Sequence, residues 1–132
     1  MVKRLIITAT LAFALAIAAP ALAAPSSILR GPVHGTLRGM NHHPKVGKNW
    51  TYTVTATDAN GRKLSGTETT EYVYGGEVVG HENPTNVHFR NGYYRDTIQF
   101  PATAVGYPLS VRVVIHTNRG SITLDWAVTV QQ

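Results

Sequence analysis

The side chains most suited to binding a metal lie in one short segment, at His34, Met40, His42 and His43. Imidazole together with a thioether suits copper, and imidazole alone also suits zinc. A metal site needs ligands held on one side of the backbone, whereas adjacent residues of an extended segment point to opposite sides. We therefore predict no cofactor and no resident metal, and keep these four residues as candidate ligands for an alternative copper- or zinc-binding function.

Catalytic patterns are missing from the sequence. None of the five serines lies in the Gly-x-Ser-x-Gly turn that exposes a nucleophile. A cysteine count of zero excludes thiol enzymes, disulfide scaffolds and cysteine-ligated zinc. Glu68 and Glu71 are three residues apart on an expected strand, so they face opposite sides and cannot form a glycosidase carboxylate pair. We predict that the protein is not an enzyme.

Tyr72 and Tyr74 are the candidate binding residues. They are two residues apart on an expected strand and therefore share one face. An exposed pair of tyrosines there would form an aromatic strip for a polysaccharide or a protein. The alternative is that both rings pack in the core, as half-buried tyrosines of strands commonly do.

The elements that must position these side chains are strands. In residues 50–57 every even position is apolar or aromatic and every odd one is threonine, which predicts a strand with one buried face. Residues 58–61 then suit a turn, and we expect residues 66–74 to return as the hairpin partner. Further strands are predicted over residues 77–81, 87–89, 93–100, 109–115 and 122–130.

Several side chains have expected places in this arrangement. Asn91-Gly92 is a strong signal for a two-residue hairpin turn that joins the strands over residues 87–89 and 93–100, and residues 118–120 are expected to form the last turn. Trp50 and Trp126 are expected between the sheets. The alternation also points Asp96 inward, so we expect it to lie near the sheet end, to bond to the backbone, or to pair with an arginine such as Arg95 or Arg112. Tyr107 is placed to form a tyrosine corner, in which its hydroxyl bonds to the backbone.

About seven short strands with turns every 8–12 residues, and no helical periodicity, predict an immunoglobulin-like antiparallel β-sandwich. A small closed β-barrel is the alternative fold. The segments Pro44-Lys45-Val46-Gly47 and Asp58-Ala59-Asn60-Gly61, followed by Gly66, resemble the opening strands of bacterial Ig-like domains. The stretches over residues 89–101, 106–109 and 124–128 are similar to small secreted single-domain proteins of high-GC bacteria, so the resemblance covers about residues 44–130. It implies the fold and carries no catalytic residues.

The first residues have the pattern of an export signal. Lys3 and Arg4 precede an apolar run, and Ala21-Leu22-Ala23 has the small-x-small form of a signal-peptidase site. We predict a signal peptide over residues 1–23, with a retained membrane anchor as the alternative. An extended linker is predicted over residues 24–44 with an edge strand near residues 36–38, and the sandwich over residues 45–132. The expected location is outside the cell or in the cell envelope or periplasm, with no membrane span after cleavage.

The charge of the chain is mildly basic. The formal net charge of +5 falls to +3 when Lys3 and Arg4 are removed with the signal peptide, and the remaining basic residues are spread along the sequence. This is too sparse for nucleic-acid binding. The sequence thus predicts a secreted, non-enzymatic domain that binds a protein or an envelope glycan, with carbohydrate binding as one alternative and metal binding as the other.

Overall fold

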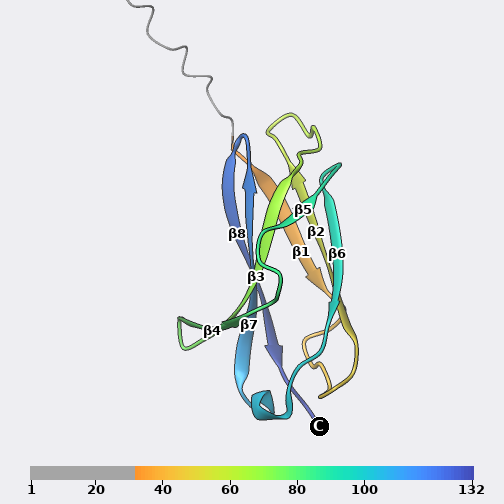
Figure 1. Cartoon of the computed structure of the whole chain (residues 1–132), viewed down its shortest axis with the longest axis vertical. Coiled ribbons are helices and arrows are strands. Elements are labelled where there is room, and N and C mark those ends of the chain that lie inside the picture. The colour runs from red at the N-terminus through yellow and green to blue at the C-terminus, as the bar shows by residue number, and fades with distance from the viewer. Residues whose placement is uncertain (1–31) are drawn as a thin grey trace, which may run out of the picture.

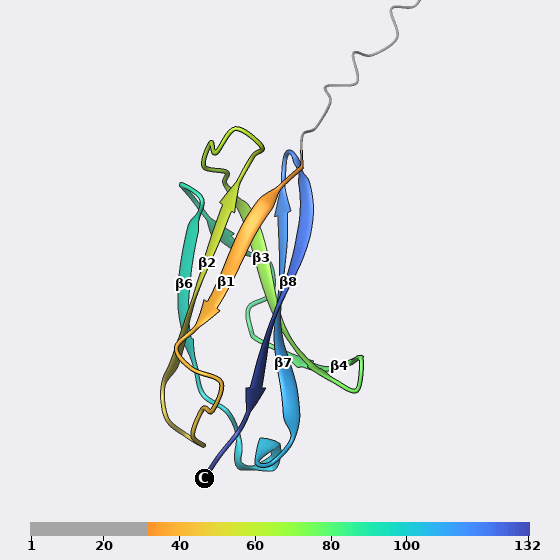
Figure 2. The same cartoon turned by 180° about the vertical axis from the view of Figure 1, so that it is seen from behind.

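Two antiparallel β-sheets pack face to face in residues 32–132, the part of the chain that the computed structural model describes (Figures 1 and 2). The predicted signal peptide lies outside the described residues. The strands and one short 3₁₀ turn are β1 (His34–Gly39), β2 (Trp50–Thr57), β3 (Gly66–Tyr74), β4 (Glu77–His81), β5 (Val87–Phe89), β6 (Tyr93–Ile98), η1 (Ala102–Ala104), β7 (Pro108–Thr117) and β8 (Gly120–Thr129).

The strand order confirms the predicted sandwich. One sheet has the order β1-β2-β6, and the other has the order β4-β3-β7-β8 with β5 also paired to β3. The first, second and sixth strands therefore form one layer, and the third, seventh and eighth the other. This is the division of strands found in immunoglobulin-type sandwiches. Within the described residues no strand pairing closes the sheets into a barrel, so the alternative fold was wrong.

Strand β2 has the one buried face that the alternation in its sequence predicts. Its four apolar side chains are buried and its threonines face outward, in a strict pattern over all eight residues. Trp50, Tyr52, Val54 and Ala56 are each at most 1% exposed, and they pack against the inward residues of β7, of which Val111, Val113 and Ile115 are fully buried. Strand β2 thus forms the centre of the core.

The expected hairpin between β2 and β3 was wrong. β2 pairs with β1 and β6, while β3 lies in the other sheet, so residues 58–65 cross from one sheet to the other. The turn residues themselves behave as predicted, since the carboxylate of Asp58 accepts the backbone N–H groups of Asn60 and Arg62, both at 2.9 Å. Leu64 then enters the core at 6% exposure and directs the chain across.

The Asn91-Gly92 turn forms as predicted. Both residues have positive φ, 56° and 65°, as a two-residue hairpin turn requires. The expected hairpin between the strands on either side of it was wrong, because β5 pairs with β3 in one sheet and β6 pairs with β2 in the other.

The described part of the predicted linker, residues 32–44, belongs to the sandwich. Its expected edge strand forms as β1, which pairs with β2 from His34↔Thr57 to Gly39↔Tyr52. Residues 41–44 then close the end of the sandwich, where Thr129 N donates to His42 O at 2.8 Å and Gln131 N to Pro44 O at 2.8 Å. The sandwich therefore includes residues on the N-terminal side of the predicted boundary at residue 45. No helix in the described part of the chain is long and apolar enough to cross a membrane.

Candidate functional site

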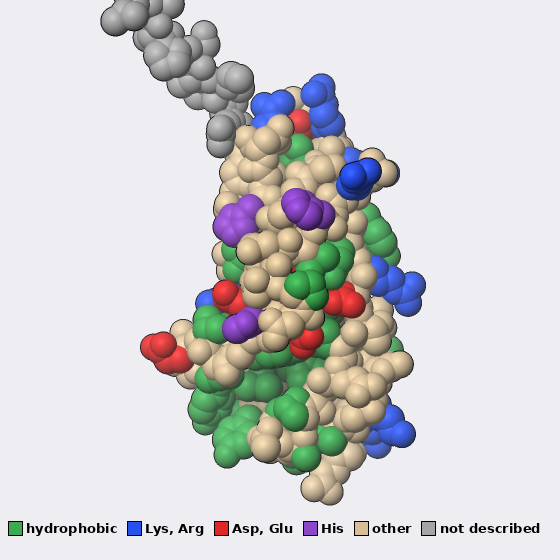
Figure 3. Space-filling view, in the orientation of Figure 1, with side chains coloured by type: hydrophobic (Ala, Val, Ile, Leu, Met, Phe, Trp, Pro, Cys, Tyr) green, Lys and Arg blue, Asp and Glu red, His purple; other side chains and the backbone are tan. Residues whose placement is uncertain are grey.

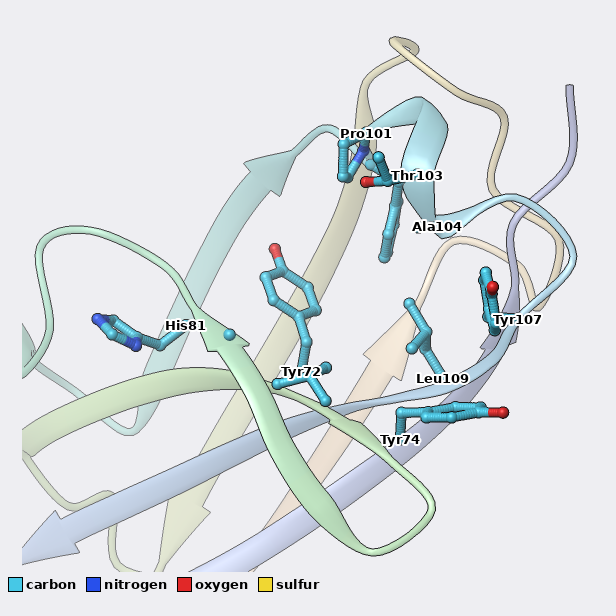
Figure 4. Close-up of a pocket in the computed structure, with 11 residues that line it drawn as sticks. Tyr72, Tyr74, His81, Pro101, Thr103, Ala104, Tyr107 and Leu109 are labelled. Carbon is cyan, nitrogen blue, oxygen red and sulfur yellow. The ribbon is translucent and has the colours of Figure 1, made fainter.

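An aromatic groove of about 430 Å³ lies on the described surface, and it is more enclosed than two larger hollows of about 490 and 590 Å³. It lies where the β3–β4 hairpin approaches the η1 turn and the start of β7 (Figures 1 and 4). The side chains that give it its character are apolar or aromatic, and they are Tyr72, Tyr74, Phe100, Pro101, Tyr107 and Leu109. We refer to this site as the aromatic groove.

Two exposed tyrosines form the open end of the aromatic groove. Tyr74 ends β3 and is 44% exposed, and Tyr107 precedes β7 and is 50% exposed. Their ring centroids are 5.5 Å apart at an interplanar angle of 86°, an edge-to-face contact that holds both rings in place. The predicted tyrosine corner was wrong, because Tyr107 turns its ring to Tyr74 and its hydroxyl has no hydrogen bond within residues 32–132.

Tyr72 forms the inner wall of the same groove. Its ring lies edge-on to Phe100 at a centroid distance of 5.9 Å, and its hydroxyl donates a hydrogen bond to Glu82 Oε1. Burial and the neighbouring Glu82 carboxylate raise the pKa of this phenol above its usual value. The core-packing alternative is therefore correct in part for Tyr72, whereas Tyr74 is exposed. The structure brings both tyrosines to one site, as Figure 4 shows.

A row of hydrogen-bonded polar side chains is buried between the two sheets, and it was not predicted from the sequence. Thr70 Oγ1 donates to Glu68 Oε2 at 2.9 Å, and because its proton is used there, the Tyr52 hydroxyl donates to Thr70 at 2.6 Å. Glu68, Thr70 and Tyr52 are at most 2% exposed. Asp96 lies nearby and accepts hydrogen bonds from Tyr94 Oη at 3.2 Å and from its neighbour's backbone N–H at 2.7 Å. The Asp96 carboxylate is therefore satisfied by a backbone group, as one option had it, and by the Tyr94 hydroxyl, and no arginine among residues 32–132 pairs with it.

This buried row of polar side chains predicts a pH-dependent stability. Burial raises the pKa of Glu68 above its usual value, and the nearby Asp96 and Glu82 carboxylates add to that effect. The folded state therefore holds this proton more tightly than the unfolded state does, and the free energy of unfolding falls as pH rises through the folded pKa. Glu68→Gln keeps an acceptor for Thr70 and removes the charge, so we expect it to be more stable than wild type by about 1 kcal/mol at neutral pH.

Urea unfolding of both proteins between about pH 4 and pH 8 tests this expectation. The advantage of the Gln variant should shrink toward the acid end, where Glu68 is protonated in both states of the wild type. A difference that does not change with pH would contradict a titrating Glu68.

The candidate metal ligands occupy separate places. His42 stacks on Trp126 with ring centroids 4.4 Å apart and an interplanar angle of 6°, and its Nδ1 contacts Ala127 O at 2.6 Å. His34 begins β1 and Met40 follows its end, which puts them about 20 Å apart along an extended strand. His43 is exposed beside His42. Within residues 32–132 no group of three or more His, Cys, Asp or Glu side chains is placed to hold a metal ion.

Comparison of the sequence with family models and with curated proteins finds no match. No family model matches the chain, and no curated protein matches it in sequence. The predicted resemblance to bacterial Ig-like domains and to secreted proteins of high-GC bacteria therefore has no support from sequence families.

Structural comparison does find neighbours. A protein of the DUF4785 family from Legionella pneumophila superposes with a TM-score of 0.54 at 10% identity, over 75% of this chain and 28% of its own. A candidate superoxide reductase from Thermotoga maritima superposes with a TM-score of 0.52 at 8% identity, over 74% of this chain and 86% of its own. The chain thus spans little more than a quarter of the Legionella protein's length. At these identities the likeness concerns the all-β fold.

Proposed function

We propose that this chain is an exported, non-enzymatic binding module whose ligand occupies the aromatic groove. The observation that carries the proposal is the pair of exposed tyrosine rings, Tyr74 and Tyr107, at the open end of a hollow of about 430 Å³. Ligand sites commonly have volumes of about 300–1,000 Å³ and are lined mainly by apolar and aromatic side chains with a few polar groups. The export part of the proposal rests on the signal pattern of residues 1–23.

The groove chemistry supports binding without catalysis. Among the described residues, its titratable lining side chains are three tyrosines and His81, with no carboxylate. An acid–base pair of carboxylates, as glycosidases use, is therefore missing from this groove. The Tyr72 hydroxyl already donates to Glu82, which fixes the ring as a wall.

A carbohydrate is the ligand class that the groove favours. The C–H faces of a sugar ring pack on aromatic rings, and its hydroxyls can bond to the phenols of Tyr74 and Tyr107 and to the hydroxyl of Thr103, all at the groove. The volume of about 430 Å³ suits a short stretch of a polysaccharide chain.

Tyr74→Ala tests the groove, because Tyr74 is exposed and its removal leaves the core intact. We expect saturable retention of the exported chain on insoluble peptidoglycan, chitin or cellulose, and an affinity at least about tenfold lower for the variant, since aromatic side chains dominate such contacts. The measurement is the depletion of protein from solution at increasing amounts of polysaccharide.

The matched control is Val78→Ala, which also removes an exposed apolar side chain of the same hairpin but from outside the groove. Its binding should equal that of wild type. The groove would be overturned as a carbohydrate site if no polysaccharide retained the wild type. Equal losses of affinity in Tyr74→Ala and Val78→Ala would overturn it as well.

A further inference from the structure

The outer face of the β1-β2-β6 sheet carries cations and hydroxyls without an acid. Strand alternation directs ten side chains to this face, and none of them is a carboxylate. Six are threonines, two are arginines, and the others are a histidine and a tyrosine. We call this surface the threonine face.

Two arginines stand in one row across the threonine face. The pairing register places Arg38 opposite Thr53, and Thr53 opposite Arg95. Because neighbouring strands are about 4.8 Å apart, the two arginine backbones are about 10 Å apart with a hydroxyl between them. Both arginines are exposed, and neither has a carboxylate within salt-bridge distance in the described part of the chain.

The opposite sheet shows that this lack of acids is particular to one face. There the row across β3, β7 and β8 places Glu71 opposite Arg112 and Arg112 opposite Asp125. Arg112 Nε donates to Asp125 Oδ1 at 2.9 Å, so that arginine is already satisfied. In Figure 3 most of the visible Lys and Arg side chains lie at the top and along the right-hand side of the molecule, the side where β6 lies in Figure 1. Most of the visible Asp and Glu side chains lie in the middle and at the left.

The hydroxyls around the arginine row are held in place by one another. Thr36 and Thr55 share a hydrogen bond of 2.6 Å between their Oγ1 atoms, and Thr51 and Thr97 share one of 2.9 Å. The hydroxyl of Thr53, between the arginines, has no partner among residues 32–132 and is available to a ligand.

From this arrangement we propose that the threonine face binds an anionic polysaccharide, with Arg38 and Arg95 each holding an acidic group of the chain and Thr53 bonding a sugar oxygen between them. Guanidinium groups bind carboxylates and sulfates through two parallel hydrogen bonds. Tyr93, 52% exposed two positions before Arg95, gives a ring on which a sugar can pack.

The charge density favours a polysaccharide over a nucleic acid. Nucleic-acid surfaces have dense basic patches that match one phosphate per few ångströms, whereas this face has two arginines about 10 Å apart. Acidic groups that recur once per sugar or once per disaccharide match that spacing better.

The experiment measures binding of the exported chain to dextran sulfate and to polygalacturonate, with uncharged dextran and double-stranded DNA alongside. We expect wild type to bind one or both acidic polysaccharides, with an affinity that falls as salt rises, and not to bind dextran. The double variant Arg38→Gln with Arg95→Gln should lose at least about tenfold in affinity. Thr53→Val, which keeps the β-branched shape, should lose about threefold.

The matched control is Arg62→Gln with Lys63→Gln, which removes two positive charges from the turn after β2 and should lose less than about threefold. Equal losses of affinity in both double variants would mean that binding depends on net charge alone, and would overturn a specific site on the threonine face. Failure of wild type to bind either acidic polysaccharide, or tighter binding to DNA than to both, would also overturn it. None of these outcomes depends on the aromatic groove, because Tyr74→Ala should bind dextran sulfate as wild type does.

Discussion

Gly66→Ala is expected to prevent folding or to destabilise the protein by at least about 4 kcal/mol. A methyl group at this position would lie 2.0 Å from the carbonyl oxygen of His116 and 3.0 Å from its carbonyl carbon. Gly66 pairs with Phe89 of β5 on one side and with Thr117 of β7 on the other, so its backbone cannot move without breaking a ladder. The neighbour is backbone, which has no rotamer that would relieve the contact.

Gly80→Ala is the matched control, because Gly80 also lies in a strand of the same sheet. A methyl group there would meet only the Cδ2 atom of Tyr72 at 3.5 Å, an ordinary contact. We expect its free energy of unfolding, measured in urea by circular dichroism, to stay within about 1 kcal/mol of wild type. A Gly66→Ala protein with the stability of the Gly80→Ala protein would show that β3 and β7 are less closely packed than the structure has them.

The fold was predictable as far as local patterns determine it. The alternation in β2 fixes which side chains are buried, and Asn91-Gly92 fixes a turn with two positive φ values. Neither pattern says which strands pair. The short connections after β2 and after β5 resemble hairpin loops in sequence, yet each leads to the other sheet, because Leu64 and Phe89 are buried between the layers.

The candidate site was predictable only in part. Tyr72 and Tyr74 share a site because two-residue spacing puts them on one face, but Tyr107 joins them through a contact between residues 33 apart in sequence. Such a contact follows from the sheet packing and leaves no local signal. Glu68 was missed for the same reason, because its burial depends on the opposite sheet. The two residues before it and the two after it in β3 are all threonine or glycine, which suggests a solvent-exposed face.

The histidine segment shows how a chemical pattern can serve the fold. His42 has a residue type and neighbours that suit a metal, and in the structure its ring covers Trp126 while its Nδ1 contacts the edge of β8 at Ala127 O. An open strand edge is a site for unwanted pairing, and covering it is a common solution. These contacts give His42 a structural role that its sequence context does not reveal.

The largest cost among core substitutions is expected for Trp50→Ala, about 3–5 kcal/mol. Trp50 is 1% exposed and lies against Tyr52 and Phe100, with ring centroids at 6.1 Å and 5.7 Å. Its removal leaves a cavity between the sheets that these rigid neighbours cannot fill. For a domain of this size the loss corresponds to a fall in Tm of more than about 10 °C, which thermal unfolding followed by circular dichroism would measure.

Comparison with Trp126→Ala distinguishes the cost of the core cavity from the cost of the lost indole hydrogen bond. Both indoles donate to the same acceptor, Asn41 O, at 3.1 Å from Trp50 and 3.2 Å from Trp126, so each variant loses one such bond and leaves the carbonyl with the other. Trp126 is only partly buried and packs on His42 at the surface, so its removal should cost about 1–2 kcal/mol. Equal losses in the two variants would mean that the shared bond to Asn41 dominates. A larger loss of unfolding free energy in Trp50→Ala would mean that close packing of the interior contributes more to the stability of this sandwich than that hydrogen bond does.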